Sequence, residues 1–395
     1  MTHLMNTYNR LPVAFTHGHG ARLYDAEGRE YLDALAGIAV NGLGHAHPKL
    51  VAALQEQVGR LIHTSNLYRV TEQEQLADRI CELSGMQEVF FGNSGSEANE
   101  GALKLVRLHG HQHGEPEAQT IVMENAWHGR TLATLAATGS EKARKGFGPM
   151  PSGFIRVPYN DLAAVQKAAD ADPRVRAVWI EVLQGEGGIQ VADIEFVRGL
   201  RRMADERGWL LMIDEVQSGI GRTGKWFAHQ WAGITPDVMT LAKGLGSGVP
   251  IGACVAAGRA AGVFGPGNHG TTFGGGPLAM RAGLETLKII EAEGLMANAV
   301  EQGDRIRAGL EARLGSLPGV REVRGRGLMI GIELDRPCGE LVKSALDAGL
   351  LINVTRDNVI RLLPPLVIKG SDADLIVERL APLVARFVAA PARAA

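Results

Sequence analysis

The feature that most constrains this chain is a pair of short apolar segments that each lead into a charged residue. Residues 210–213 (LLMI) are followed directly by Asp214, and residues 238–242 (VMTLA) are followed by Lys243. Each segment has the length and composition of a buried parallel strand. Ligands of open α/β sheets bind at the carboxyl ends of such strands. We therefore expect an acid and an amine to face one common cleft.

The segment between these two strands looks like a phosphate-binding P-loop but departs from it. Residues 219–225 read GIGRTGK, and the next position, which is Ser or Thr in a P-loop, is Trp226. The loop also follows the sequence DEVQS, so it does not join a strand directly to a helix. A nucleotide-binding module is therefore an alternative that the sequence disfavours.

Bulk composition narrows the class of protein. A chain of 395 residues is long enough for two domains, and its formal net charge of -2 gives no reason to expect nucleic acid or a membrane surface as partner. The three scattered cysteines suit a reducing compartment. The first ten residues lack the apolar core of a signal peptide, and no apolar run reaches membrane-spanning length. We expect a cytoplasmic enzyme that binds no metal.

Strand and helix patterns alternate along the middle of the chain. Apolar strand-like runs begin at residues 89, 120, 175, 210 and 238, and helical patterns begin near residues 97 and 194. This order predicts right-handed crossovers and a mostly parallel sheet in a large α/β domain. From Val320 the short strands indicate a smaller α+β domain. We assign residues 1–60 and 276–395 to the small domain and its linking helix, and residues 61–275 to the large domain.

Two further segments supply groups that could hold a ligand. Gly95 and Ser96 lie where a strand gives way to a helix, and such helix starts bind anions through backbone N–H groups. An ordinary turn with a serine N-cap explains the same residues. Trp127 and Arg130 follow the strand at residue 120, and an aromatic ring with a guanidinium suits a planar ring and a carboxylate. A half-buried tryptophan and a surface arginine are equally compatible with that segment alone.

Taken together, these groups match the needs of pyridoxal phosphate. Its phosphate requires backbone and hydroxyl donors, its ring a stacking face, its aldehyde a lysine, and its pyridine nitrogen a carboxylate. The sequence offers Gly95 and Ser96, Trp127, Lys243 and Asp214 for these four positions. Each group alone is a weak indication, and their placement at strand ends makes pyridoxal phosphate the expected cofactor.

The same segments resemble the class III, or ω-amino acid, aminotransferases, a family with the fold type I architecture of pyridoxal-phosphate enzymes. Within that class the chain is most similar to the acetylornithine aminotransferase group. The motifs, in order, are PVAF at Pro12, GIAVNGLGHAHP at Gly37, NSGSEANE at Asn93, WHGRT at Trp127, QGEGG at Gln184, IDEVQSGIGRTG at Ile213, LAKGLGSGVPIGA at Leu241 and GTTFGGGPLA at Gly270. The resemblance implies a seven-stranded-type sheet in the large domain and a homodimer.

The resemblance also implies roles for the residues around the cofactor. Lys243 would bind it covalently and act as general base, while Asp214 would pair with the pyridine nitrogen. The ring would stack on Trp127, where the family usually has Phe. The other cofactor-binding positions implied by the family pattern are Gly95, Ser96, Glu215, Val216, Gln217 and Thr272, the last reaching in from a second subunit.

Substrate recognition is implied at a second set of positions. Arg130, with Thr271 beside it, would bind the carboxylate of N-acetylornithine. Arg361 would bind the carboxylate of glutamate or 2-oxoglutarate, and Glu186 would cover that arginine when the ω-amine is bound. Ornithine aminotransferases carry a tyrosine where this chain has Ile38, and its absence favours an acylated substrate.

The implied reaction moves the terminal amino group of N2-acetyl-L-ornithine to 2-oxoglutarate in arginine biosynthesis. N-acetyl-L-glutamate 5-semialdehyde and L-glutamate are the products. Succinylornithine, succinyl-diaminopimelate, ornithine and 4-aminobutyrate are alternative amines. A glutamate-1-semialdehyde mutase-type isomerase is a further alternative, and it would need no external keto acid.

Overall fold

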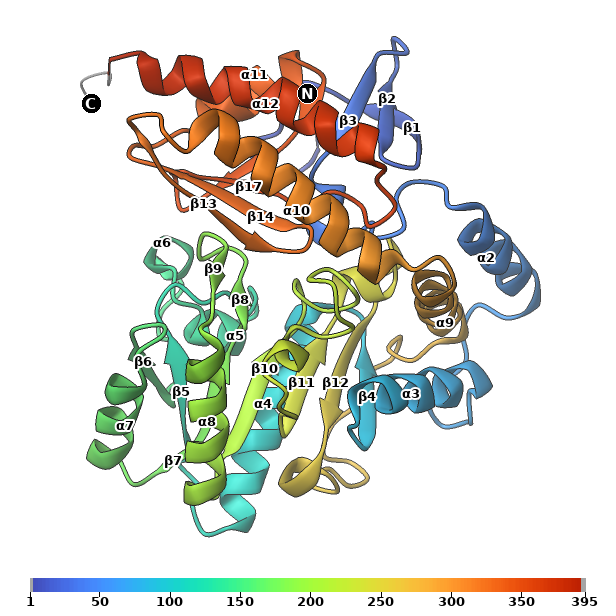
Figure 1. Ribbon diagram of the computed structural model, residues 1–395. Helices are drawn as coiled ribbons and strands as arrows, with labels where there is room; N and C mark the ends of the chain where they lie inside the picture. Colours follow the sequence, from blue (N-terminus) through green and yellow to red (C-terminus); the bar gives the residue numbers. More distant parts are fainter. Residues whose placement is uncertain (1–2, 392–395) are drawn as a thin grey trace.

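A seven-stranded sheet forms the centre of the molecule in the computed structural model, which describes residues 3–391 (Figure 1). In spatial order its strands are β4 (Glu88–Gly92), β12 (Gly252–Ala256), β11 (Val238–Leu241), β10 (Leu210–Asp214), β7 (Val175–Ile180), β5 (Gln119–Met123) and β6 (Phe154–Val157). Only β12 runs antiparallel to its neighbours in this sheet. The predicted mostly parallel seven-stranded sheet is therefore confirmed.

Helices cover both faces of this sheet, which explains why its strands are apolar throughout. Along β7, Ala177 and Trp179 pack in the same cluster as side chains of α4 (Gly95–Gln112). Val178 and Ile180 point to the opposite face and pack with side chains of α8 (Ile194–Arg207). The other helices before the C-terminal part are α1 (Ala36–Ala39), α2 (Pro48–Arg60), α3 (Thr71–Ser84), α5 (Leu132–Ala137), α6 (Glu141–Arg144) and α7 (Leu162–Ala171).

The C-terminal residues form a second layer, coloured orange to red in Figure 1. We call residues 320–389 the C-terminal layer. Its sheet contains, in spatial order, β13 (Val320–Arg326), β14 (Met329–Leu334), β17 (Val359–Leu362) and β16 (Asn353–Thr355). Its helices are α11 (Glu340–Asp347) and α12 (Gly370–Ala389). Helix α10 (Leu295–Leu314) packs against α12 and β13.

The N-terminal segment joins this layer through a small sheet of its own. Its strands are β1 (Phe15–His19), β2 (Arg22–Asp25), β3 (Glu30–Asp33) and β15 (Leu350–Leu351). Strand β15 comes from the C-terminal layer and pairs in parallel with β3. A separate hairpin of β8 (Leu183–Gln184) and β9 (Gln190–Val191) projects from the end of β7.

One stretch of helical periodicity, from Ala279 to Leu314, is divided in the structure. It forms α9 (Pro277–Ala292) and then α10, with Gly294 between them at a φ of 63°. That left-handed conformation costs glycine little and ends a helix, which is how one sequence pattern gives two helices. Among residues 3–391, no helix is both long and apolar enough to cross a membrane.

Candidate active site

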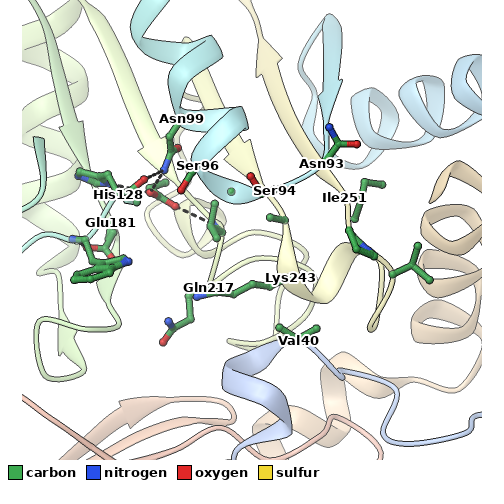
Figure 2. A pocket seen from close by; sticks show the side chains of 18 of the residues that line it. Val40, Asn93, Ser94, Ser96, Asn99, His128, Glu181, Gln217, Lys243 and Ile251 are labelled. Carbon is green, nitrogen blue, oxygen red and sulfur yellow. Dashed lines mark hydrogen bonds and ion pairs between the residues drawn. The ribbon is translucent and has the colours of Figure 1, made fainter. Parts of the chain in front are cut away.

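A pocket of about 360 Å³ lies at the carboxyl ends of β10 and β11, and both Asp214 and Lys243 line it (Figure 2). Asp214 is the last residue of β10, and Lys243 follows β11 by two residues. The two strands are parallel neighbours, so their ends meet at one edge of the sheet. The acid and the amine therefore share one cleft, as the strand pattern predicts.

Asp214 is held at the floor of the pocket by three donors. His128 Nδ1 lies 2.8 Å and Asn99 Nδ2 2.9 Å from its Oδ2, and the backbone N–H of Val216 lies 3.0 Å from its Oδ1 (Figure 2, dashed lines). Because Asp214 is only 4 % exposed, these bonds replace the water that a buried carboxylate would otherwise need. His128 in turn stacks on Trp179, with the ring centroids 3.7 Å apart.

Lys243 begins a short 3₁₀ turn, Lys243–Leu245, in an unusual backbone conformation. Its φ is 43°, a left-handed value that non-glycine residues rarely adopt outside functional sites. Burial of its amine, together with the charge of Arg361, lowers the pKa of Lys243 to about 8. A larger fraction of the side chain is then neutral near pH 7, which is the form that can attack a carbonyl carbon.

The start of α4 provides an anion site beside these two residues. Ser94 is the N-cap, and its Oγ accepts from the N–H of Glu97. Gly95 follows, and a Cβ at that position would lie 2.7 Å from Cγ1 of Val216. Only glycine therefore fits where the helix start approaches the loop after β10. Ser96 also lines the pocket, so hydroxyl and backbone donors converge there.

Trp127 forms a wall of the pocket and is fixed by a buried acid. Its backbone N–H donates to Oε2 of Glu181 at 2.9 Å, and Oε1 of Glu181 accepts from the N–H of Gly185 at 3.2 Å. Burial and the nearby charge of Asp214 raise the pKa of Glu181 to about 8. Arg130 is exposed, and its guanidinium carbon lies 4.8 Å from the centroid of the Trp127 ring.

A buried charged group of the C-terminal layer contacts Gln217, one of the residues that line the pocket. Arg361, on β17, is 1 % exposed. Its Nη1 lies 2.7 Å from Oε1 of Glu186 and 3.2 Å from Oε1 of Gln217, and its Nε donates to Oδ1 of Asn353 at 3.0 Å. The structure thus joins three sequence-predicted residues, Arg361, Glu186 and Gln217, in one hydrogen-bonded group.

Some of the expected site residues lie elsewhere. The side chain of Glu215 is buried away from the pocket and accepts from the Ser218 hydroxyl and the N–H groups of Ala228 and His229, so the structure gives it a structural role instead. Val40, and not Ile38, lines the pocket with Lys243.

Thr271 and Thr272 line a different hollow, together with His63 and Asn66. Thr272 is exposed on the surface of the chain. Within the described residues of one chain, neither threonine lines the pocket that contains Lys243.

Sequence reasoning did not identify His128, Asn99 or Glu181 as site residues. His128 stands inside the WHGRT motif and Asn99 inside NSGSEANE, so motif membership was the signal that could have found them. For Glu181 the sequence holds one signal: it is the acid that directly follows the apolar strand at residues 175–180.

These residues fit pyridoxal phosphate. A buried carboxylate and an amine face the same pocket, as a pyridine nitrogen and an aldehyde require. The start of α4 offers N–H and hydroxyl donors to a phosphate. Trp127 offers a ring face on the pocket wall, and the close approach at Gly95 leaves no room for a side chain there. Asp214, Lys243, Gly95, Ser96 and Trp127 are the residues that would hold the cofactor.

Comparisons with known proteins agree with this arrangement. The acetylornithine aminotransferase 1 of Bordetella bronchiseptica is 66% identical over 386 residues, which cover 98% of this chain and 98% of the relative. The solved N-acetylornithine aminotransferase of Stenotrophomonas maltophilia is 35% identical with a TM-score of 0.84, covering 97% of this chain and 98% of that one.

A solved ornithine aminotransferase of Toxoplasma gondii, described with partial occupancy of PLP at its active site, is 33% identical with a TM-score of 0.93. The match covers 97% of this chain and 92% of that one. The family model for class-III aminotransferases matches residues 4–384. The chain therefore belongs to the class-III aminotransferases, which are pyridoxal-phosphate-dependent transaminases.

Proposed function

We propose that this chain is an acetylornithine aminotransferase, which transfers the terminal amino group of N2-acetyl-L-ornithine to 2-oxoglutarate in arginine biosynthesis. The observation that carries the proposal is that two arginines, which could each bind a carboxylate, contact two different residues of the pocket lining, Gln217 and Trp127. Arg361 lies buried beside Gln217, and Arg130 lies exposed against Trp127. The identity with relatives named for this activity supports the choice of substrate.

When bound, pyridoxal phosphate supplies the electron sink that stabilises negative charge on the substrate carbon. Lys243 Nζ would move a proton from the substrate carbon that bears the amine to the aldehyde carbon of the cofactor, and it would move a proton in the opposite direction in the second half-reaction. Asp214, fixed by His128 and Asn99, would keep a negative charge at the floor of the pocket. A buried charge held by fixed donors needs no reorganisation during the reaction.

Binding of two unlike substrates would depend on the Glu186–Arg361 pair. A bare guanidinium beside the apolar methylene groups of the ω-amine would be uncompensated, and Glu186 at 2.7 Å neutralises it. A dicarboxylate would replace Glu186 with its own carboxylate. The side chain of Glu186 is 31% exposed, whereas that of Arg361 is 1% exposed, so the acid is the partner with freedom to move. A Glu186→Ala variant in which both half-reactions keep their normal rate ratio would contradict this gate.

A panel of half-reactions tests the proposed substrate. We expect N2-acetylornithine to react with the cofactor-loaded enzyme about a hundredfold faster than ornithine or 4-aminobutyrate at limiting concentration. Arg130 would hold the α-carboxylate, and Val40, the residue of this segment that lines the pocket, offers no hydroxyl to a free α-amine. The loss of cofactor absorbance after mixing with each amine gives the rate constants. Faster reaction of ornithine would contradict the assignment, and turnover without any keto acid would point to the isomerase instead.

We also propose a homodimer in which Thr272 of one protomer completes the partner's site. Thr272 is exposed outside its own pocket, and exposed apolar side chains gather on the elements around it: Ile62, Leu67, Tyr68 and Phe273. These elements contact one another. The ring of His63 packs on Phe273, and the side-chain amide of Asn66 donates to the carbonyls of Thr271 and Gly274. Large exposed apolar patches mark interfaces. A monomer mass in sedimentation equilibrium would contradict the dimer.

Domain limits and location complete the proposal. Residues 61–275 would form the cofactor-binding domain, and residues 1–60 would join 276–395 in the small domain, which the pairing of β3 with β15 supports. Cys81, Cys254 and Cys338 are unpaired, which supports a reducing cytoplasmic location. Domain-wise proteolysis and cell fractionation would test these two assignments.

A further inference from the structure

The loop that carries Glu186 has an unusual backbone. We call residues 185–189 the gate loop. Ile189 has a φ of 53° and Gly188 a φ of 99°. A β-branched residue such as Ile189 avoids the left-handed region, so it stays there only when its surroundings fix it. The side chain of Ile189 is fully buried, and it packs so closely on Gly331 that a Cβ there would lie 2.8 Å from its own Cβ.

Arg324, on β13, supplies the main polar contacts to this strained segment. Its Nη2 donates to the Gly188 carbonyl at 2.6 Å, and its Nε lies 3.2 Å from that carbonyl and 3.1 Å from the Ile189 carbonyl. The guanidinium is itself held by Glu322 at 2.8 Å and Glu333 at 2.7 Å. With 8 % of the residue exposed, these charge-assisted bonds are largely shielded from water.

A second contact holds the loop at Glu186 itself. The hydroxyl of Thr355, on β16, donates to the backbone carbonyl of Glu186. Strand β16 pairs with β17, which carries Arg361, and Gly331 lies opposite Arg361 in the register of β14 and β17. The backbone of the gate loop and Arg361 are therefore fixed to the same sheet of the C-terminal layer. Because both are fixed, the Glu186 carboxylate can separate from Arg361 only by rotation of its side chain, and the backbone of the gate loop stays in place.

Room for that separation exists next to the pair. A cleft of about 710 Å³ is lined by Glu186 and Trp127. Its other charged side chains are the bases Lys142, Arg144, Arg156 and Arg356 and the acids Glu124, Glu141 and Asp357. The Nε atom of Arg144 is buried and has no hydrogen-bond partner among the described residues. A carboxylate that rotates away from Arg361 would thus have room in a cleft where basic side chains stand among the acids.

We propose that Arg324 is a positioning residue of the gate: it holds the gate-loop backbone in its left-handed conformation, so that Glu186 covers and uncovers Arg361 by side-chain rotation alone. This inference rests on the proposed function, because it takes the Glu186–Arg361 pair as the gate between two substrates. Arg324 touches neither pocket nor substrate, so its effect would pass entirely through the carbonyls of Gly188 and Ile189.

The experiment uses full-length, cofactor-loaded enzyme with Arg324→Gln and, as matched control, Arg321→Gln. Arg321 lies on the same strand and also bonds Glu333, at 3.2 Å, but it makes no hydrogen bond or ion pair with the gate loop among the described residues. Hydrogen exchange of the peptide 183–191 should quicken by about tenfold in Arg324→Gln, the factor that loss of one charge-assisted hydrogen bond corresponds to. It should stay unchanged in the control.

The ratio of the two half-reaction rates distinguishes a positioning role from a merely structural one, because a general loss of structure would lower both rates alike. In Arg324→Gln, kcat/KM for N2-acetylornithine should fall by about tenfold while that for glutamate changes less than about threefold, because only the ω-amine needs Glu186 over Arg361. Arg324→Lys keeps the charge but not the planar fork, so its effects should be intermediate. If the glutamine variant does not fold, the lysine variant is judged by the same two measurements.

Unchanged exchange in the gate loop, or an equal fall in both half-reactions, would overturn the proposal. A Glu186→Ala variant separates this failure from failure of the gate. If Glu186→Ala shifts the rate ratio towards glutamate but Arg324→Gln does not, only the positioning role is wrong. If Glu186→Ala leaves the ratio unchanged, the gate itself is absent, and the role of Arg324 in it falls too.

Discussion

Replacement of Lys243 by alanine is expected to lower kcat for transamination by about four orders of magnitude, the upper range for loss of a positioned acid–base group. The amine shares with Asp214 a pocket that contains no other lysine among its lining residues. Its pKa of about 8 makes it a better nucleophile and base at neutral pH than an ordinary lysine. Single-turnover rates with N2-acetylornithine would measure the loss.

Lys225 is the matched control for this change. It belongs to the GIGRTGK segment, donates to the carbonyl of Gln230 at 3.1 Å and lies over the ring of Trp231. Lys225→Ala should leave kcat within about twofold, because the structure uses this amine for local packing and not in the pocket. Cofactor that remains attached to Lys243→Ala at its native site after borohydride reduction would show that another residue holds it.

The local sequence predicted the parts of the site that depend on strand ends. When a charged residue follows an apolar run directly, the chain buries the run as a strand and leaves the charge at the edge of the sheet. The positions of Asp214 and Lys243 were therefore predictable without a structure. The glycine and serines before α4 were predictable for a similar reason, since a helix start after a strand exposes N–H groups. The helix begins at Gly95 and not near Glu97, because Ser94 is the N-cap.

Residues that support the site from a distance were not predictable in this way. Asn99 and His128 are 115 and 86 residues from Asp214, and nothing in their local pattern indicates that both donate to one carboxylate. The bond between Glu181 and Trp127 likewise spans 54 residues. Such contacts depend on how crossovers place separate strands, which local periodicity does not encode.

Glu215 is a cofactor-binding position that the family resemblance implies, and its side chain does not line the pocket that contains Lys243. It stands next to Asp214 in the sequence. Successive side chains at a strand end point to opposite sides, so one acid faces the pocket while its neighbour faces the core. Glu215 accepts four hydrogen bonds, from Ser218, Ala228 and His229, which flank the segment 219–227 and are tied by them to the end of β10. The carboxylate satisfies these donors and does not line the pocket that contains Lys243.

The single substitution Asp214→Asn is expected to lower kcat about a hundredfold to a thousandfold. A fall of this size is typical for loss of one preorganised electrostatic group. The change keeps the size of the side chain and removes its charge. Ionised Asp214 can only accept, so His128 must carry its proton on Nδ1 at 2.8 Å, and Asn99 must present its amide at 2.9 Å. Both of these donors bond the same oxygen, Oδ2, and Oδ1 accepts from the Val216 N–H. Asparagine has one acceptor oxygen, so either the Val216 N–H or both His128 and Asn99 lose their acceptor.

Asp237→Asn separates loss of charge in the pocket from loss of a buried aspartate in general. Asp237 precedes β11 at the end of the strands away from the pocket, is 6 % exposed, and accepts from Arg201 and from the N–H of Leu211, both at 2.8 Å. Its replacement should lower the unfolding free energy by about 2 kcal/mol and leave kcat nearly unchanged. Asp214→Asn should show the opposite balance: a large fall in kcat and a shifted absorbance of the bound cofactor, with a smaller loss of unfolding free energy. If the two variants lost equal stability and equal activity, the carboxylate of Asp214 would serve the fold and not the chemistry.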